Sequence, residues 1–172
     1  DELHRQTARQ IDLLNDWLQK LTKTDDPKEK SELLRRIVVV GAYLKRRNNL
    51  ILVNEQDGVI KEEELNLSIQ EMIKNLQLAG IPCAGTVDFD IDLPTDVAMK
   101  LFDFYEYVVE NAFDGLGSLL ARFFYRDNSF YACIDAVCSL DLTRLQNEQI
   151  FVSVSDKNCY TLSLKIEGGD GR

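Results

Sequence analysis

The chain has 172 residues, 45% of them hydrophobic, which allows a sizeable core in one domain or in a helical module with one compact domain. A formal net charge of −9 argues against nucleic acid as the main partner, because neutralising phosphates requires a basic surface. The four cysteines form no Cys-x-x-Cys pair and the chain has a single histidine, so the usual zinc spacings are excluded and we expect reduced, mostly buried thiols.

The first residues do not resemble a signal peptide, and no apolar run reaches the ~18 residues that a membrane span needs. The sequence also begins inside a helical pattern and without a start methionine. We therefore expect the cytoplasmic part of a longer protein, and a membrane-anchored sensor region upstream of the chain is compatible with this pattern.

Residues 3–21 carry apolar side chains at the 3-4 spacing of a coiled-coil seam, which predicts a helix that needs a partner. Thr24-Asp25-Asp26-Pro27 then predicts a break, in which Asp26 caps a second helix and Pro27 occupies the first position of that helix. The second helix is expected over residues 27–53. Its apolar stripe should face the first helix, as in an antiparallel hairpin, and comprises Leu33, Leu34, Ile37, Val40, Gly41 and Leu44.

A hairpin of this length covers only part of its apolar surface, so pairing two copies into a four-helix bundle is the simplest way to bury both stripes. We therefore expect a homodimer, with a hairpin domain over residues 1–55. The segment Asn54-Glu55-Gln56-Asp57-Gly58 is rich in turn-forming residues and predicts the domain boundary.

Residues 59–167 alternate between helical and extended patterns. We expect helices over 62–79 and 97–113, a strand over 81–91, and two β-hairpins, 119–125 with 130–137 and 150–154 with 160–166. These elements predict a two-layer α/β sandwich. The predicted fold class is therefore α+β, with an N-terminal helical hairpin that forms a dimeric four-helix bundle, followed by this sandwich.

With these elements in place, the chain resembles the cytoplasmic core of sensor histidine kinases, in which a histidine-phosphotransfer hairpin precedes an ATPase domain of the GHKL type. Leu3-His4-Arg5-Gln6 is similar to the phosphoacceptor stretch, although Arg5 stands where the family usually has an acidic residue. Glu110-Asn111-Ala112 is similar to the asparagine box. The resemblance implies that Asn111 helps to hold magnesium against the nucleotide phosphates and that Glu110 polarises an attacking group.

The segment Tyr43-Leu44-Lys45-Arg46-Arg47-Asn48-Asn49-Leu50 also resembles a signature of some Gram-positive membrane-sensor kinases. Its basic cluster, Lys45-Arg46-Arg47, predicts a solvated face, or else a contact with an acidic partner or an anionic membrane surface.

Two departures from the family concern the nucleotide site. Asp135 stands where the resemblance places the adenine-binding aspartate, but Ala136-Val137-Cys138 follows it without a glycine, so the backbone cannot approach a base as usual. Residues 138–149 are too few for a lid and a second glycine loop, so a phosphate-binding helix terminus would lack its loop. The resemblance implies ATP and magnesium as cofactors, whereas these departures favour a chain that binds neither.

His4 and Asn111 each have two interpretations. An imidazole with its unperturbed pKa of ~6.5 is largely neutral at pH 7 and can attack a phosphoryl group, but the heptad that runs through Ile11 places His4 on the inner stripe as a structural residue. Asn111 can bind magnesium, or it can form hydrogen bonds within its own helix.

The first functional hypothesis is two-component signal transduction, in which His4 passes a phosphoryl group to or from the receiver domain of a response regulator, with ATP binding reduced or lost. The same departures argue against autokinase activity. The alternative is a non-catalytic pseudokinase scaffold or docking module.

Overall fold

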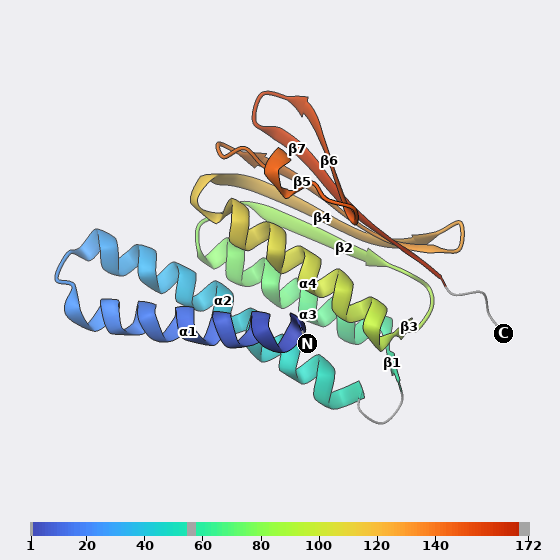
Figure 1. Ribbon diagram of the computed structural model, residues 1–172, viewed down its shortest axis with the longest axis horizontal. Coiled ribbons are helices and arrows are strands. Elements are labelled where there is room, and N and C mark those ends of the chain that lie inside the picture. The colour runs from blue at the N-terminus through green and yellow to red at the C-terminus, as the bar shows by residue number, and fades with distance from the viewer. Residues whose placement is uncertain (1, 55–57, 169–172) are drawn as a thin grey trace.

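The computed structural model describes the backbone of residues 2–54 and 58–168, and the side chains of residues 8–52 and 58–168. Two long antiparallel helices begin the chain, α1 (Glu2–Lys23) and α2 (Pro27–Asn54) (Figure 1). The Asp26 carboxylate accepts a hydrogen bond from the Lys28 backbone N–H at 3.0 Å, and Pro27 is the first residue of α2. The predicted hairpin and its capped break are therefore confirmed.

The rest of the chain forms the predicted α/β sandwich. A five-stranded sheet has the order β2-β4-β5-β7-β6, in which β2 and β4 are parallel and all other neighbours are antiparallel. The strands of this sheet are β2 (Cys83–Asp88), β4 (Leu116–Arg126), β5 (Ser129–Cys138), β6 (Ile150–Asp156) and β7 (Cys159–Glu167). The remaining elements are α3 (Glu62–Leu78), α4 (Thr95–Ala112), the short strands β1 (Val59–Ile60) and β3 (Leu93–Pro94), and the 3-10 turns η1 (Phe113–Gly115) and η2 (Thr143–Leu145).

The two predicted β-hairpins are present. Asp127 and Asn128, between β4 and β5, have φ angles of 49° and 56°, and Asn158, between β6 and β7, has a φ of 64°. Aspartate and asparagine tolerate this left-handed backbone better than other residues with side chains, which is why they favour tight hairpin turns. The turn residues in the sequence therefore set the register of both hairpins.

The molecule is layered (Figure 1). Helices α3 and α4 cover one face of the sheet, α2 packs on the other side of these two helices, and α1 packs on α2. One hydrophobic core runs without interruption from α2 through α3 and α4 to the sheet. The α2 side chains buried in this core are Val39, Val40, Tyr43, Leu44 and Leu50.

The orientation of α2 differs from the expected one. Leu34, expected to face α1, is 48% exposed, whereas Val39 and Tyr43 are buried against the sandwich. Apolar residues lie on more than one face of α2, and the α3/α4 layer offers a larger apolar surface than the single helix α1 does. The larger surface therefore determines which face of α2 is turned inward.

The basic cluster on α2 is paired within the chain. Arg47 forms a buried ion pair with Asp103 of α4, with its Nε 3.0 Å from Oδ1, and the Tyr43 hydroxyl donates a hydrogen bond to the same oxygen at 2.7 Å. Arg46 forms an ion pair with Glu71 of α3, while Lys45 remains exposed. Two of the three basic side chains thus attach α2 to the sandwich.

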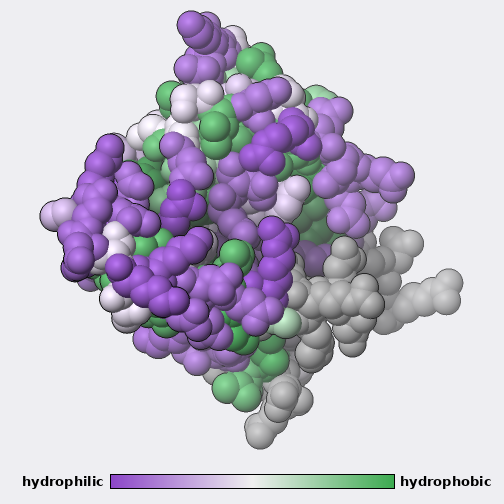
Figure 2. Space-filling view, turned by 60° about the vertical axis from the view of Figure 1, so that its left-hand side comes forward, coloured by the Kyte–Doolittle hydropathy of each residue, from purple (hydrophilic) through white to green (hydrophobic). Residues whose placement is uncertain are grey.

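No helix in the described part of the chain is long and apolar enough to cross a membrane. Figure 2 shows a face on which hydrophilic residues predominate, with hydrophobic ones in small separate patches.

Candidate functional site

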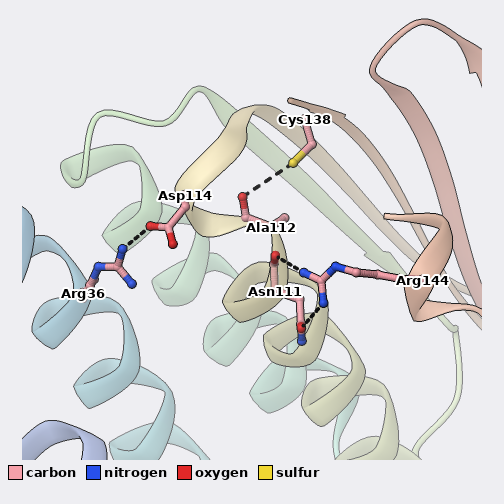
Figure 3. Close-up of polar contacts among 6 residues, drawn as sticks. All are labelled: Arg36, Asn111, Ala112, Asp114, Cys138 and Arg144. Atoms are coloured by element: carbon pink, nitrogen blue, oxygen red, sulfur yellow. Dashed lines mark hydrogen bonds and ion pairs between the residues drawn. The ribbon is translucent and has the colours of Figure 1, made fainter. Parts of the chain in front are cut away.

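Asn111 lies in the last turn of α4, and both ends of its side-chain amide are hydrogen-bonded within the chain. Figure 3 shows its contacts with Arg144. Its Nδ2 donates to the Tyr107 carbonyl oxygen at 2.8 Å, and its Oδ1 accepts from the Arg144 guanidinium at 3.2 Å. A second nitrogen of Arg144 donates to the main-chain oxygen of Asn111 at 2.9 Å. The guanidinium therefore binds both oxygens of Asn111.

Arg144 is carried by the short segment between β5 and β6. It belongs to η2, and on either side of it Leu142 and Leu145 are buried in the core. The Asp141 carboxylate accepts hydrogen bonds from the backbone N–H and hydroxyl of Thr143, and these bonds lower the pKa of Asp141. The segment that is too short for a lid instead presents a cation to the end of α4.

Other contacts hold the same end of α4 (Figure 3). The Cys138 thiol donates to the Ala112 carbonyl oxygen at 3.6 Å, and burial raises the pKa of this thiol. Arg36 of α2 forms an ion pair with Asp114, and its guanidinium lies 5.6 Å from the centre of the Phe113 ring. The last carbonyl groups of a helix have no partners within it, and these contacts supply some of them.

A groove of about 1,240 Å³ runs beside α4. Glu110 and Asn111 line it from α4, and Arg9 and Gln10 line it from α1. The Gln10 side chain is only 2% exposed, yet neither its amide nitrogen nor its amide oxygen has a hydrogen-bond partner. Glu110 and Asn111 thus line the same groove.

His4 lies in the first turn of α1, and its side chain is outside the described residues. Only the helix relates His4 to the groove. Gln10, which lines the groove, follows His4 on α1 after less than two turns.

Asp135 is not brought together with Asn111. Its neighbours along β5, Ile134 and Ala136, are buried beneath the helices, so Asp135 points to the opposite face of the sheet. There it accepts hydrogen bonds from Arg122 at 2.8 Å and Thr161 at 2.6 Å. These contacts are cross-strand pairs of a sheet surface and do not form part of the groove beside α4.

The residues present do not fit a magnesium-bound nucleotide. The Asn111 oxygen that would bind the metal already accepts from a permanent cation, and a second cation there would be repelled. Asp135 cannot reach a base in the groove from the far face of the sheet. Among the described residues, no group of three or more His, Cys, Asp and Glu side chains is placed to hold a metal ion.

Glu106 is a buried acid that the sequence analysis did not identify. Its side chain is fully buried on α4, neither carboxyl oxygen has a hydrogen-bond partner, and desolvation, followed by Glu110 and Asp103, raises its pKa well above the ordinary value of 4.5. A signal existed, since an acidic residue stands between Tyr105 and Tyr107 in a run of apolar and aromatic residues. Arg144 had no comparable local signal.

No family model and no curated protein matches the sequence. Among solved structures, the chain is similar to the histidine kinase AdeS of Acinetobacter baumannii, at 12% identity and a TM-score of 0.47, over 94% of this chain and 96% of that one. A bacterial phosphotransferase is similar at 12% identity and a TM-score of 0.49, over 91% of this chain and 88% of that one. The histidine kinase ThkA, in complex with the response regulator protein TrrA, is similar at 10% identity and a TM-score of 0.42, over 96% of this chain and 60% of that one.

Proposed function

We propose that the chain is a histidine-kinase-like signalling module in which His4 exchanges a phosphoryl group with the receiver domain of a response regulator, without ATP bound to the chain itself. The observation that carries this proposal is the contact between Arg144 and Asn111, in a chain that has the predicted helical hairpin and α/β sandwich. It supports the loss of ATP binding, because the guanidinium occupies the oxygen that would otherwise be available to a metal ion. The phosphoryl group must then come from a partner.

The transfer needs no nucleotide. A neutral ring nitrogen of His4 attacks the phosphorus of the receiver's aspartyl phosphate with its lone pair. The nitrogen–phosphorus bond forms as the bond from phosphorus to the aspartate oxygen breaks, and the carboxylate leaves with the electron pair. The reverse step returns the phosphoryl group to an aspartate.

Incubation with receiver domains phosphorylated with radioactive acetyl phosphate should label the wild-type chain and leave His4→Gln unlabelled. Radioactive ATP with magnesium should label neither protein, because no phosphoryl donor site is expected in the chain. Equal labelling of both proteins, or no labelling from any receiver in a broad panel, would contradict transfer through His4 and favour the scaffold. Labelling from ATP would contradict the proposed loss of the nucleotide site.

We also propose that two copies of the chain pair through the hairpin. Ile11 and Leu18 of α1 are 48% and 46% exposed, and Leu34 and Val38 of α2 are 48% and 44% exposed. Exposed apolar side chains repeated along two adjacent helices favour burial against a second copy, as in a four-helix bundle.

Light scattering at micromolar concentration should give twice the 19.7 kDa chain mass. The double variant Ile11→Ser with Leu18→Ser should weaken dimerisation at least about 100-fold, because two buried aliphatic side chains are lost from each copy. Phe151→Ser removes an even more exposed apolar side chain, from β6, and should leave the dimer intact. A monomeric wild type would overturn the proposal, as would equal dissociation in both variants.

A docking module without catalysis remains the second candidate function, and the groove favours it. A buried side-chain amide with free donor and acceptor groups, as at Gln10, is uncommon unless a bound molecule satisfies it. The labelling experiment separates the two functions, because a docking module accepts no phosphoryl group.

A further inference from the structure

We propose that Arg144 is a tethered cation that takes the place of a metal ion at Asn111 and keeps this end of α4 closed to divalent cations. This inference rests on one part of the proposed function, the loss of the cofactor site, and names the residue responsible for that loss. Phosphoryl transfer through His4 does not depend on it.

The contact has the geometry expected of a substitute cation. Two guanidinium nitrogens point to two oxygens of one residue, the Asn111 side-chain oxygen at 3.2 Å and its main-chain oxygen at 2.9 Å. These oxygens lie at the C-terminal end of α4, where the helix dipole is negative and favours a positive charge. Arginine stays protonated at every physiological pH, so this cation is permanent.

The backbone that carries Arg144 is held on both sides. Leu142 and Leu145 are buried in the core, and Asp141 fixes the start of η2 through Thr143. The Asn111 amide is held as well, because its nitrogen donates to Tyr107 one turn earlier. The backbone that carries Arg144 and the side-chain amide of Asn111 are thus each held by contacts of their own.

The same geometry excludes a metal ion. A divalent cation on the Asn111 side-chain oxygen would lie within a few ångströms of the guanidinium, and like charges so close repel even at a partly exposed site. Glu110 shares the groove with Asn111 and carries the negative charge that would otherwise attract a cation. Removing the charge of Arg144 should therefore make the position accessible.

Manganese provides a direct probe, because the paramagnetic ion broadens nearby NMR signals. With Mn²⁺ alone added to the full chain, the Asn111 side-chain amide signal should stay sharp in the wild type and in Arg144→Lys, which keeps the charge. In Arg144→Ala and Arg144→Gln we expect broadening at least about tenfold greater, because the repulsion is gone. Arg144→Gln retains hydrogen-bonding groups and serves if the alanine variant folds poorly.

Arg126→Ala is the matched control, since it also removes one positive charge next to an acid, Asp127, but at the exposed end of β4. It should leave the Asn111 signal sharp. Broadening of Asn111 in the wild type as strong as in Arg144→Ala would overturn the proposal, and so would a sharp signal in both neutral variants. Broadening in Arg126→Ala would show that net charge, and not Arg144, controls access.

Discussion

Replacing Glu106 with methionine should stabilise the protein by about 2 kcal/mol at pH 7, because it removes a buried polar group that has no hydrogen-bond partner. Methionine has nearly the same length and shape, so it should fill the same space on α4 without creating a cavity. Most substitutions in a core destabilise, so a gain of this size would be diagnostic of the orphaned carboxyl group.

The gain should depend on pH in a defined direction. The pKa of Glu106 is raised in the folded state, so at low pH the carboxyl group is protonated in both states and the protonation of Glu106 favours neither. As the pH rises above 4.5, the unfolded chain releases this proton while the folded chain retains it, and stability falls until the folded pKa is reached. The advantage of Glu106→Met over the wild type should therefore grow as the pH rises above 4.5.

Urea unfolding at several pH values measures both effects. Glu106→Gln should remove the pH-dependent part of the stability difference but keep a buried polar group. At low pH it should therefore stabilise the protein less than Glu106→Met does. Glu63→Gln removes the same charge from an exposed site on α3 and should change stability by less than about 0.5 kcal/mol. A Glu106→Met protein less stable than the wild type would show that the carboxyl group has a stabilising role.

Replacing Arg47 with methionine should destabilise the protein by about 3 kcal/mol, because it leaves the largely buried Asp103 carboxylate without its counter-charge. Burial opposes the charge on Arg47, but the hydrogen bonds and attraction to Asp103 outweigh it and raise the pKa of the guanidinium. Tyr43 would remain as a donor to the carboxylate, and one neutral hydroxyl does not balance a full charge.

The ion pair between Arg126 and Asp127 serves as the control. Both side chains are largely exposed, so Arg126→Met should cost less than about 1 kcal/mol. Combining Arg47→Met with Asp103→Leu should recover much of the loss, because no charge is then left unpaired in the core. An Arg47→Met protein within 1 kcal/mol of the wild type in urea unfolding would rule out a structural role for the pair.

Local signals in the sequence predicted most of the fold. Asp26-Pro27 marked the start of α2, and the residue pairs at 127–128 and 157–158 marked the turns of both hairpins, because these positions depend on backbone chemistry within a few residues. The packing partner of α2 was not predictable in this way. A stripe such as Val39 and Tyr43 shows that a helix face is buried, but it does not specify which surface covers the face.

The candidate site was only partly predictable for the same reason. Glu110 and Asn111 were recognised as a short motif, and the structure places them in one groove. Asp135 was assigned through the family resemblance alone, although the alternation of Ile134 and Ala136 around it already placed it on the other face of the sheet. Arg144 lies 33 residues from Asn111 along the chain, and no local pattern predicts such a contact.

The uninterrupted core has a consequence for how an input could reach the site. Turning the hairpin as a rigid body would expose Val39, Tyr43 and Leu44 to water and break the Arg47 ion pair, which is costly. Helix α1 packs chiefly on α2, and sliding or rolling it over a stationary α2 would uncover far less apolar surface. Such a movement would carry His4 along while Asn111 stays fixed, so the helix that carries His4 would move independently of the rest of the molecule.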